Sequence, residues 1–235
     1  MENAKRILVC EDEDAIREFV VINLKRAGYE VVDVASGEAA LETYKQENGG
    51  FGMALLDIML PGIDGLSVCK QLRESDKQIG IIMLSAKSQE MDKVGGLMQG
   101  ADDYVTKPFS PMELVARVDA VFRRVGMGGA DSAASSELVS GPFVLNIKSR
   151  TLHKDGVRID LTQVEFQLLE YLMRNPNVAL DRSTLLATVW GDSYCGDDKI
   201  VDVNVRRLRM KIEDVPSDPH YLTTVWGFGY KWRED

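Results

Sequence analysis

Five short apolar runs alternate with segments of helical periodicity in the first half of the sequence. Each run is too short for a helix and is followed by a segment in which apolar side chains recur every three or four residues. Apolar strands that alternate with amphipathic helices pair in parallel, because the helices cover both faces of the sheet. The pattern predicts an α/β domain with a five-stranded, doubly wound parallel sheet. The expected strands are Ile7–Cys10, Val31–Ala35, Met53–Leu56, Ile81–Leu84 and Tyr104–Thr106, and the expected helices are Asp14–Ala27, Gly37–Gln46, Gly65–Glu74, Met91–Gln99 and Pro111–Arg124.

The composition and the pattern of the sequence change after residue 125. Gly, Ala and Ser dominate Gly126–Glu137, which has no periodicity and is typical of a linker. Short strand-like segments, three helical patterns and a terminal hairpin with two glycines follow, which is the order of a winged helix-turn-helix. We expect a first domain at residues 1–125, a flexible linker at 126–138 and a winged-helix domain at 139–235. The second-domain strands expected are Phe143–Ile147, Thr151–Lys154, Val157–Asp160, Tyr221–Val225 and Tyr230–Trp232, and the helices are Gln163–Asn175, Arg182–Trp190 and Lys199–Ile212.

The net charge of −9 argues by itself against a protein that binds nucleic acid. Residues 127–235 carry 13 basic and 16 acidic side chains, but five of the basic ones lie between Lys199 and Lys211. Because DNA affinity depends on the local field over the phosphates, one basic helix on an acidic domain is compatible with weak binding. The sequence has no apolar run long enough for a membrane span or a signal peptide, and its three cysteines have no metal-ligand spacing. We expect a cytoplasmic protein that does not associate with membranes.

Charged and hydroxyl side chains stand at the ends of four predicted strands. Glu11 and Asp12 follow the first strand, Asp57 the third, Ser85 the fourth and Lys107 the fifth. These ends meet at one edge of a doubly wound sheet. Carboxylates brought together need a cation, and oxygen ligands suit Mg²⁺; a carboxylate can also attack phosphorus to form an acyl phosphate. A lone Asp at a strand end is usually a helix cap, so the prediction of a phosphoryl-transfer pocket rests on the joint occurrence of these residues.

Four segments carry a resemblance to a known family: Ile7–Glu13, Leu56–Gly62, Leu84–Ala86 and Gly100–Phe109. Through them residues 5–124 closely resemble the flavodoxin-like receiver domain of two-component response regulators, specifically of the OmpR/PhoB family. The spacing of these segments is highly specific.

The resemblance implies a role for each pocket residue. Asp57 is the expected phosphoacceptor, and Mg²⁺ is expected on Asp12, Asp57 and the Met59 backbone carbonyl, with Glu11 acting through water. Lys107, before a cis Pro108, is the expected cation beside the phosphoryl group. The family places a hydroxyl switch at Ser85 and an aromatic side chain that reorients with it at Tyr104.

A second set of segments resembles the effector domain of the same family across residues 142–233: Leu161–Leu169, Val189–Gly191, Val201–Arg209 and Gly227–Tyr230. In the expected helix Lys199–Ile212, four apolar residues mark a buried stripe, and the polar residues are expected largely off it. Many relatives have an Arg that enters the minor groove where this chain has Trp226, which we expect to pack on the domain core. The expected DNA-binding residues are Lys199, Asn204, Arg206, Arg207 and Lys211.

The resemblance also implies partners: a sensor histidine kinase, double-stranded promoter DNA and, through the loop Asp192–Asp198, RNA polymerase. Phosphorylation is expected to join two receivers into a homodimer. Oppositely charged residues on one face predict intersubunit pairs between Lys93 and Glu113 and between Asp103 and Arg117. The expected interface residues are Lys93, Asp102, Asp103, Glu113 and Arg117.

Other classes of protein fit the sequence less well. A phosphatase or phosphomutase with an aspartyl-phosphate needs a general acid two residues after the nucleophile, and Met59 cannot transfer protons. A flavin or nucleotide site needs a Gly/Ser/Thr loop after the first strand, and the acidic run Glu11–Asp14 would repel phosphate. We therefore expect a phosphorylation-switched DNA-binding regulator rather than an enzyme; the alternative is a regulator of the same fold that works without phosphorylation.

Overall fold

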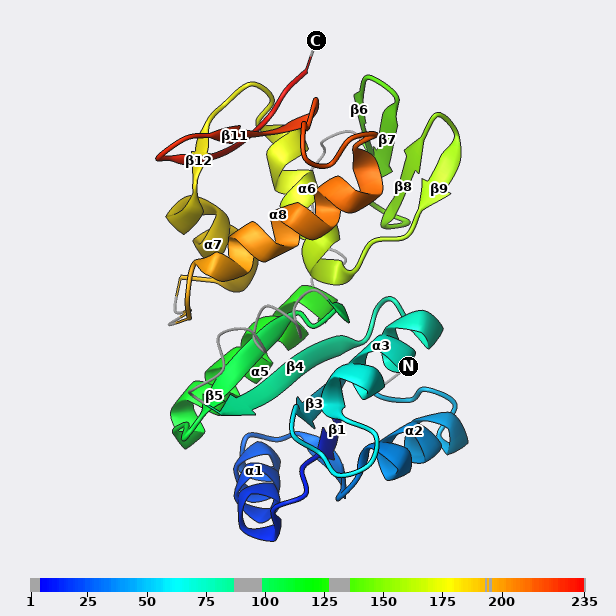
Figure 1. The fold of residues 1–235 in the computed structure, drawn as a ribbon, viewed down its shortest axis with the longest axis vertical. Coiled ribbons are helices and arrows are strands. Elements are labelled where there is room, and N and C mark those ends of the chain that lie inside the picture. The colour runs from blue at the N-terminus through cyan, green and yellow to red at the C-terminus, as the bar shows by residue number, and fades with distance from the viewer. Residues whose placement is uncertain (1–4, 87–98, 127–135, 193, 195, 235) are drawn as a thin grey trace. The chain divides into compact units, whose positions relative to one another are not determined.

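The computed structural model describes residues 5–86, 99–126, 136–192, 194 and 196–234. Two compact units divide the chain, Met1–Gly126 and Met127–Asp235 (Figure 1). Residues 91–98 of the predicted helix and 127–135 of the predicted linker lie outside the described residues. Among the described helices none is long and apolar enough to cross a membrane.

A parallel sheet in the order β2-β1-β3-β4-β5 forms the centre of the first unit. All of β3 and nearly all of β1 are buried, as expected for strands covered on both faces. The chain adds strands in opposite directions on the two sides of the β1–β3 pair. A doubly wound sheet has a crevice at this point, outside the carboxyl ends of the strands. The predicted fold is confirmed. The strands are β1 (Arg6–Cys10), β2 (Glu30–Val34), β3 (Met53–Asp57), β4 (Gly80–Ala86) and β5 (Asp103–Lys107).

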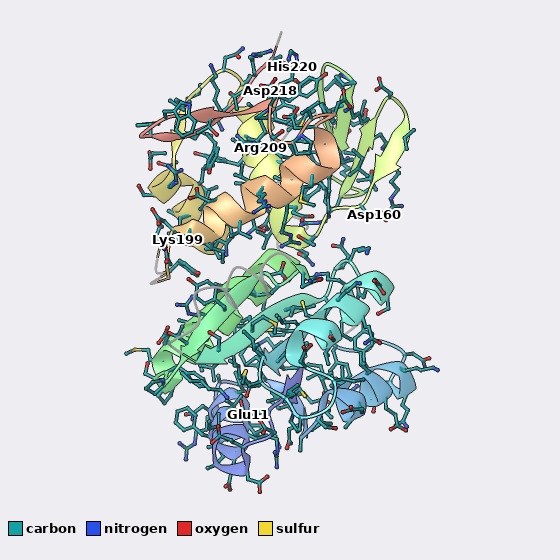
Figure 2. The ribbon with its side chains drawn as sticks, in the orientation of Figure 1. Glu11, Asp160, Lys199, Arg209, Asp218 and His220 are labelled. Atoms are coloured by element: carbon teal, nitrogen blue, oxygen red, sulfur yellow. The ribbon has the colours of Figure 1, made fainter. Side chains whose placement is uncertain are left out.

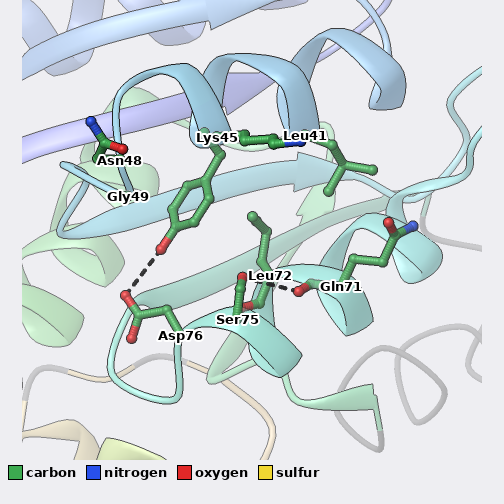
Figure 3. A pocket seen from close by; sticks show the side chains of 9 residues that line it. Leu41, Lys45, Asn48, Gly49, Gln71, Leu72, Ser75 and Asp76 are labelled. Carbon is green, nitrogen blue, oxygen red and sulfur yellow. Dashed lines mark hydrogen bonds between the residues drawn. The ribbon is translucent and has the colours of Figure 1, made fainter.

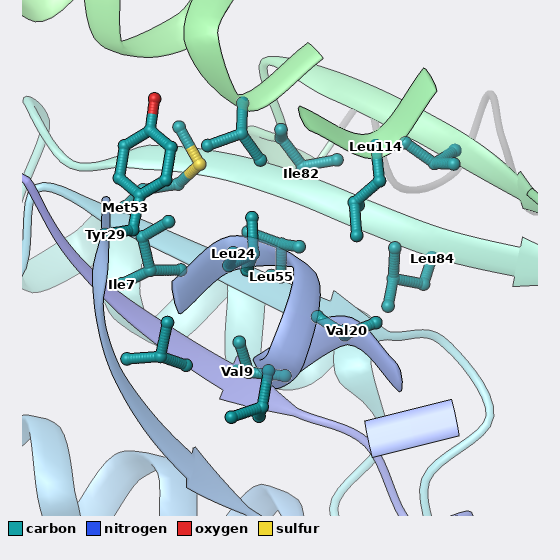
Figure 4. Close-up of a cluster of buried hydrophobic side chains, with 14 of the residues drawn as sticks. Ile7, Val9, Val20, Leu24, Tyr29, Met53, Leu55, Ile82, Leu84 and Leu114 are labelled. Carbon is teal, nitrogen blue, oxygen red and sulfur yellow. The ribbon is translucent and has the colours of Figure 1, made fainter. Parts of the chain in front are cut away.

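Helices cover the two faces of this sheet in pairs (Figure 1). One pair is α1 (Asp14–Arg26) with α5 (Pro111–Gly126), and the other is α2 (Gly37–Gln46) with α3 (Gly65–Ser75). Leu24 of α1 and Leu114 of α5 are fully buried in the apolar cluster that joins the first pair to the sheet (Figure 4). The side chains of Ser36 and Asp64 cap α2 and α3, which fixes the start of each helix close to a strand end.

The second unit has the elements of a winged helix. A four-stranded antiparallel sheet precedes three helices. A three-stranded sheet in the order β10-β12-β11 takes β10 from the segment between the first two helices and its other two strands from the C-terminal hairpin. Thr162 and Glu165 form a capping box that starts the first helix. The helices are α6 (Gln163–Arg174), α7 (Arg182–Trp190) and α8 (Lys199–Ile212), and the strands are β6 (Glu137–Ser140), β7 (Phe143–Asn146), β8 (Thr151–Lys154), β9 (Val157–Ile159), β10 (Leu180–Asp181), β11 (Leu222–Val225) and β12 (Gly229–Trp232).

Two strands differ from the sequence expectation. β6 begins at Glu137, inside the segment predicted as linker, because Leu138 pairs with Leu145 of β7. β10 has only two residues and pairs with β12. Both strands form by pairing with a neighbouring strand, and both are too short to show the alternation of apolar and polar residues that identifies a strand in the sequence.

Candidate functional site

Three carboxylates meet at the ends of β1 and β3. One carboxylate oxygen from each of Glu11, Asp12 and Asp57 lies within 4.8 Å of the other two. Glu11 is fully buried and Asp57 is 4% exposed, whereas Asp12 is exposed. Figure 2 shows Glu11 among the side chains of the first unit. The edge of the sheet thus brings together the acidic residues that the sequence predicted there.

Lys107 binds two of these carboxylates from the end of β5. Its Nζ donates hydrogen bonds of 2.8 Å to Glu11 Oε1 and 2.8 Å to Asp57 Oδ2. Its peptide bond to Pro108 is cis, as expected. A single cation therefore holds carboxylates from two other strands.

Burial sets the electrostatics of the pocket. It raises the pKa of Glu11 to about 7; Lys107 opposes this shift and the neighbouring Asp57 adds to it. Burial alone would lower the pKa of Lys107, but its hydrogen bonds to Asp57 and Glu11 outweigh that effect and raise it. Three clustered carboxylates with one lysine leave an excess of negative charge, which suits a divalent cation.

Ser85, Tyr104 and Met59 were also predicted at this site. Ser85 is 1% exposed, and its Oγ has no hydrogen-bond partner among the described residues. Tyr104 on β5 is 7% exposed. Met59 has an exposed side chain, and its backbone N–H donates to Asp57 Oδ1 at 3.3 Å. The loop after β3 and Asp12 line a hollow of about 520 Å³ that opens beside the cluster.

Sequence reasoning did not identify two residues that hold this loop. A Cβ on Gly65 would lie 1.8 Å from the backbone oxygen of Asp57, so α3 can start there only with glycine. Glu38 on α2 accepts a hydrogen bond of 2.9 Å from the backbone N–H of Ile63. A glycine at the first position of a predicted helix was the available signal for Gly65; nothing in the sequence indicated Glu38.

A second hollow of about 570 Å³ lies between α2 and α3 (Figure 3). Tyr44 on α2 donates a hydrogen bond of 3.1 Å to Asp76 across it. None of its lining residues belongs to the carboxylate cluster.

The helix α8 exposes only part of its basic side. Lys199, Arg206 and Lys211 are exposed, and Figure 2 shows Lys199 and Arg209 along this helix. Lys211 also pairs with Glu165 of α6 at 2.6 Å. Arg209 is half-buried and bonds the backbone oxygen of Leu222 at 2.8 Å.

Asn204 and Arg207 do not lie on the exposed side, contrary to expectation. Asn204 is fully buried because it stands four residues from both Ile200 and Leu208, on the same face of the helix. Its Nδ2 donates to the backbone oxygen of Ile200 at 2.8 Å. Arg207 is 6% exposed and pairs with the buried Glu165 at 2.9 Å.

Three of the residues expected at a dimer interface, Asp102, Asp103 and Arg117, are buried within the chain. Asp102 is 1% exposed and binds Arg73 and the backbone N–H of Ile81 inside the first unit. Arg117 is 7% exposed and pairs within the chain with Asp103 at 3.2 Å and with Glu113 at 3.1 Å. Only Glu113 keeps an appreciably exposed side chain among the described members of this set, and Lys93 lies outside the described residues.

Trp226 does not pack on the effector core. Its exposed fraction is 92%, at the turn between β11 and β12, whereas Trp190 and Trp232 are fully buried. The expectation of a core position was wrong, because the tight turn directs this side chain away from the domain.

Comparison with known proteins agrees with this architecture. Residues 7–119 match the response regulator receiver domain, and residues 156–232 match the C-terminal domain of transcriptional regulatory proteins. The sensory transduction protein RegX3 of Mycobacterium tuberculosis is 45% identical over 227 residues, which cover 96% of this chain and 97% of RegX3. The alkaline phosphatase synthesis transcriptional regulatory protein PhoP of Bacillus subtilis is 43% identical over 235 residues, covering 98% and 97%.

Solved structures are also similar along nearly the whole chain. A point mutant of RitR is similar with a TM-score of 0.79 and 28% identity over 98% of this chain and 100% of that one. The response regulator DrrB of Thermotoga maritima, an OmpR/PhoB homologue, has a TM-score of 0.50 and 30% identity over 97% and 98%. The chain therefore belongs to the OmpR/PhoB family of two-component response regulators, with a receiver followed by a DNA-binding transcriptional regulatory domain.

Proposed function

We propose that Asp57 accepts a phosphoryl group from a sensor histidine kinase and that this modification controls promoter binding by the second domain. The observation that carries the proposal is the pocket itself, where Lys107 binds both Asp57 and Glu11 beside the exposed Asp12. Asp57 acts as a stoichiometric acceptor, and no residue two positions later supplies a general acid.

The donor groups of the pocket fit Mg²⁺, because three carboxylate oxygens lie within 4.8 Å of one another. Asp12, Asp57 and the Met59 carbonyl would hold the ion. Glu11 would bind a coordinated water from its buried position in the same cluster. When bound, Mg²⁺ neutralises charge on the transferring phosphoryl oxygens.

The side chains of the pocket then have distinct tasks. An Asp57 oxygen forms the new bond to phosphorus as the phosphorus–nitrogen bond of the donor histidine breaks. Lys107 provides positive charge close to that oxygen, from its position 2.8 Å away. The Ser85 hydroxyl would donate to a phosphoryl oxygen, which gives a buried Oγ with no described partner a hydrogen bond.

Intact-mass measurement after incubation with acetyl phosphate and Mg²⁺ tests the proposal. The wild-type chain and Asp64→Ala should gain one phosphoryl group, because Asp64 lines the same hollow but serves as the cap of α3. Asp57→Ala, and wild type with EDTA, should gain none. Phosphorylation that survives in Asp57→Ala contradicts the proposal. A wild-type chain that binds specific DNA and never gains phosphate would favour regulation without phosphorylation.

A further inference from the structure

The loop between β3 and α3 (residues 58–64) carries Met59, whose backbone carbonyl is a proposed Mg²⁺ ligand. The loop is attached to the sheet at its start, where the backbone N–H of Ile58 donates to the backbone oxygen of Leu84 at 3.0 Å. The backbone N–H of Met59 donates to Asp57 Oδ1 at 3.3 Å. A metal ligand on a loop keeps its position only if the rest of the loop is also held.

The start of α2 holds the far end of this loop through Ile63. The backbone N–H of Ile63 donates to Glu38 Oε1 at 2.9 Å. The backbone oxygen of Ile63 lies against Gly37, where a Cβ would approach it to 2.2 Å. Gly62, with a φ of 75°, lies against the Glu38 carboxylate, since a Cβ there would be 2.4 Å from Oε1. Among the described residues, Glu38 is the only side chain that bonds the backbone of residues 60–63.

We propose that Glu38 is a positioning residue of the phosphorylation site, whose hydrogen bond to Ile63 holds the loop where Met59 can bind Mg²⁺. The inference rests on the proposed function. Glu38 is exposed and is not one of the clustered carboxylates, so it acts through the loop and not as a ligand. Side chains that orient a metal ligand contribute to metal affinity although they never touch the ion.

The charge of Glu38 is a second way in which this residue could affect Mg²⁺. Burial raises the pKa of the Cys10 thiol to about 12, and nearby carboxylates, including that of Glu38, add to the shift. Because Cys10 precedes Glu11 at the end of β1, the field of Glu38 reaches the pocket. A negative charge at this distance would favour a cation even without the hydrogen bond. The hydrogen bond and the charge therefore need separate substitutions.

The binding test titrates the full chain with MgCl₂ and follows the Mg²⁺-sensitive unfolding transition. Glu38→Ala removes the acceptor and should weaken Mg²⁺ binding about ten-fold, the lower end of the usual effect for a residue that orients a metal ligand. Glu38→Gln keeps an oxygen acceptor at the same place and loses only the charge, so it should retain most of the affinity. Glu42→Ala is the matched control, because it removes the same charge from an exposed position further along α2. It should bind Mg²⁺ as wild type does.

Phosphorylation by acetyl phosphate gives a second readout, the rate of mass gain at increasing Mg²⁺ concentration. In Glu38→Ala the Mg²⁺ concentration that gives half the maximal rate should rise about ten-fold, in line with the weaker binding. The rate at saturating Mg²⁺ should stay near that of wild type, because Asp57 and Lys107 are unchanged. A loss of folding alone would lower this maximal rate and leave the half-saturating concentration as it is.

Wild-type Mg²⁺ affinity in Glu38→Ala overturns the proposal. Equal weakening in Glu38→Ala and Glu38→Gln also overturns it, because the charge and not the hydrogen bond would then set the affinity. A wild-type chain that binds Mg²⁺ but gains no phosphoryl group would instead contradict the proposed function, and the unfolding transitions would still decide the role of Glu38.

Discussion

Glu11 lies buried beside Asp57, and burial raises its pKa from the ordinary value of 4.5 to about 7. The folded chain therefore keeps a proton that the unfolded chain releases, so the stability of the metal-free protein falls as pH rises from 4.5 to about 7. Bound Mg²⁺ favours the ionised carboxyl and must displace this proton below about pH 7.

We predict that Mg²⁺ binds more weakly at acidic pH. The apparent affinity should fall roughly ten-fold per pH unit below about 7, as linkage to one proton requires. Thermal shifts across a Mg²⁺ titration at about pH 6, 7 and 8 measure this. In Glu11→Gln the affinity should vary far less over this range. An equal Mg²⁺ affinity at the two ends of this range in the wild type would show that Glu11 is ionised throughout.

The sequence allowed the chemical groups of the pocket to be predicted, but not their burial. Strand ends that converge on one edge are a consequence of parallel topology, so Asp57, Ser85 and Lys107 could be placed together from periodicity and resemblance. Glu38 could not, because its contact with Ile63 depends on how α2 packs against a loop 25 residues away. The opposite charges of Asp103 and Arg117 indicated a pair, but not that both partners belong to one chain.

At the scale of elements, α8 shows how a helical pattern can be read incorrectly. Its bounds match the prediction, and so does the buried stripe of Ile200, Leu208 and Ile212. Polar residues on that stripe were assigned to the exposed side because of their chemistry. Asn204 lies within the stripe, and Arg207 borders it and faces Glu165. A buried acid on α6 explains why a basic residue occupies this position.

Two adjacent arginines on α8 should therefore behave differently. Arg207→Ala leaves the buried Glu165 without one of its two cationic partners and should destabilise the domain by about 3–5 kcal/mol, the usual cost of breaking a buried ion pair. Arg206→Ala, at an exposed position, should leave the unfolding midpoint unchanged and reduce the salt slope of DNA binding by about one. Urea unfolding and salt-dependent anisotropy measure the two effects. The interpretation fails if Arg207→Ala is as stable as wild type.

At the scale of the whole molecule, the structure changes the design of a dimerisation test. We propose that phosphorylated receivers pair through the face of β5 and α5. Arg117 is unsuitable for charge reversal, because its pair with Asp103 is buried within one chain. Glu113 is the more exposed acid of this network, with 34% of its side chain accessible.

Glu113→Lys should weaken dimerisation of the phosphorylated chain roughly ten-fold. The predicted intersubunit pair of Glu113 is Lys93, so the substitution would set two positive charges against each other across the interface. Sedimentation velocity over a range of concentrations measures the dissociation constant. Glu42→Lys makes the same charge change at an exposed site on α2, on the other face of the sheet, and should dimerise as wild type does. Equal dimerisation of the two variants would place the interface elsewhere.

Pairing of receivers should determine how the effectors occupy DNA. A single effector domain, with 13 basic and 16 acidic residues and one exposed basic side, should bind DNA weakly. Joining two such domains raises their effective concentration at neighbouring half-sites. The sequence between α5 and β6 is rich in Gly, Ala and Ser, a composition typical of linkers, and we propose that the two effectors do not follow the symmetry of the receivers. We predict direct-repeat half-sites about 10–10.5 base pairs apart, one helical turn, with occupancy that rises on phosphorylation and does not rise in Asp57→Ala. Footprinting with and without acetyl phosphate tests this. Protection of a single isolated half-site, equal in both conditions, would show that the effector binds DNA independently of the receiver.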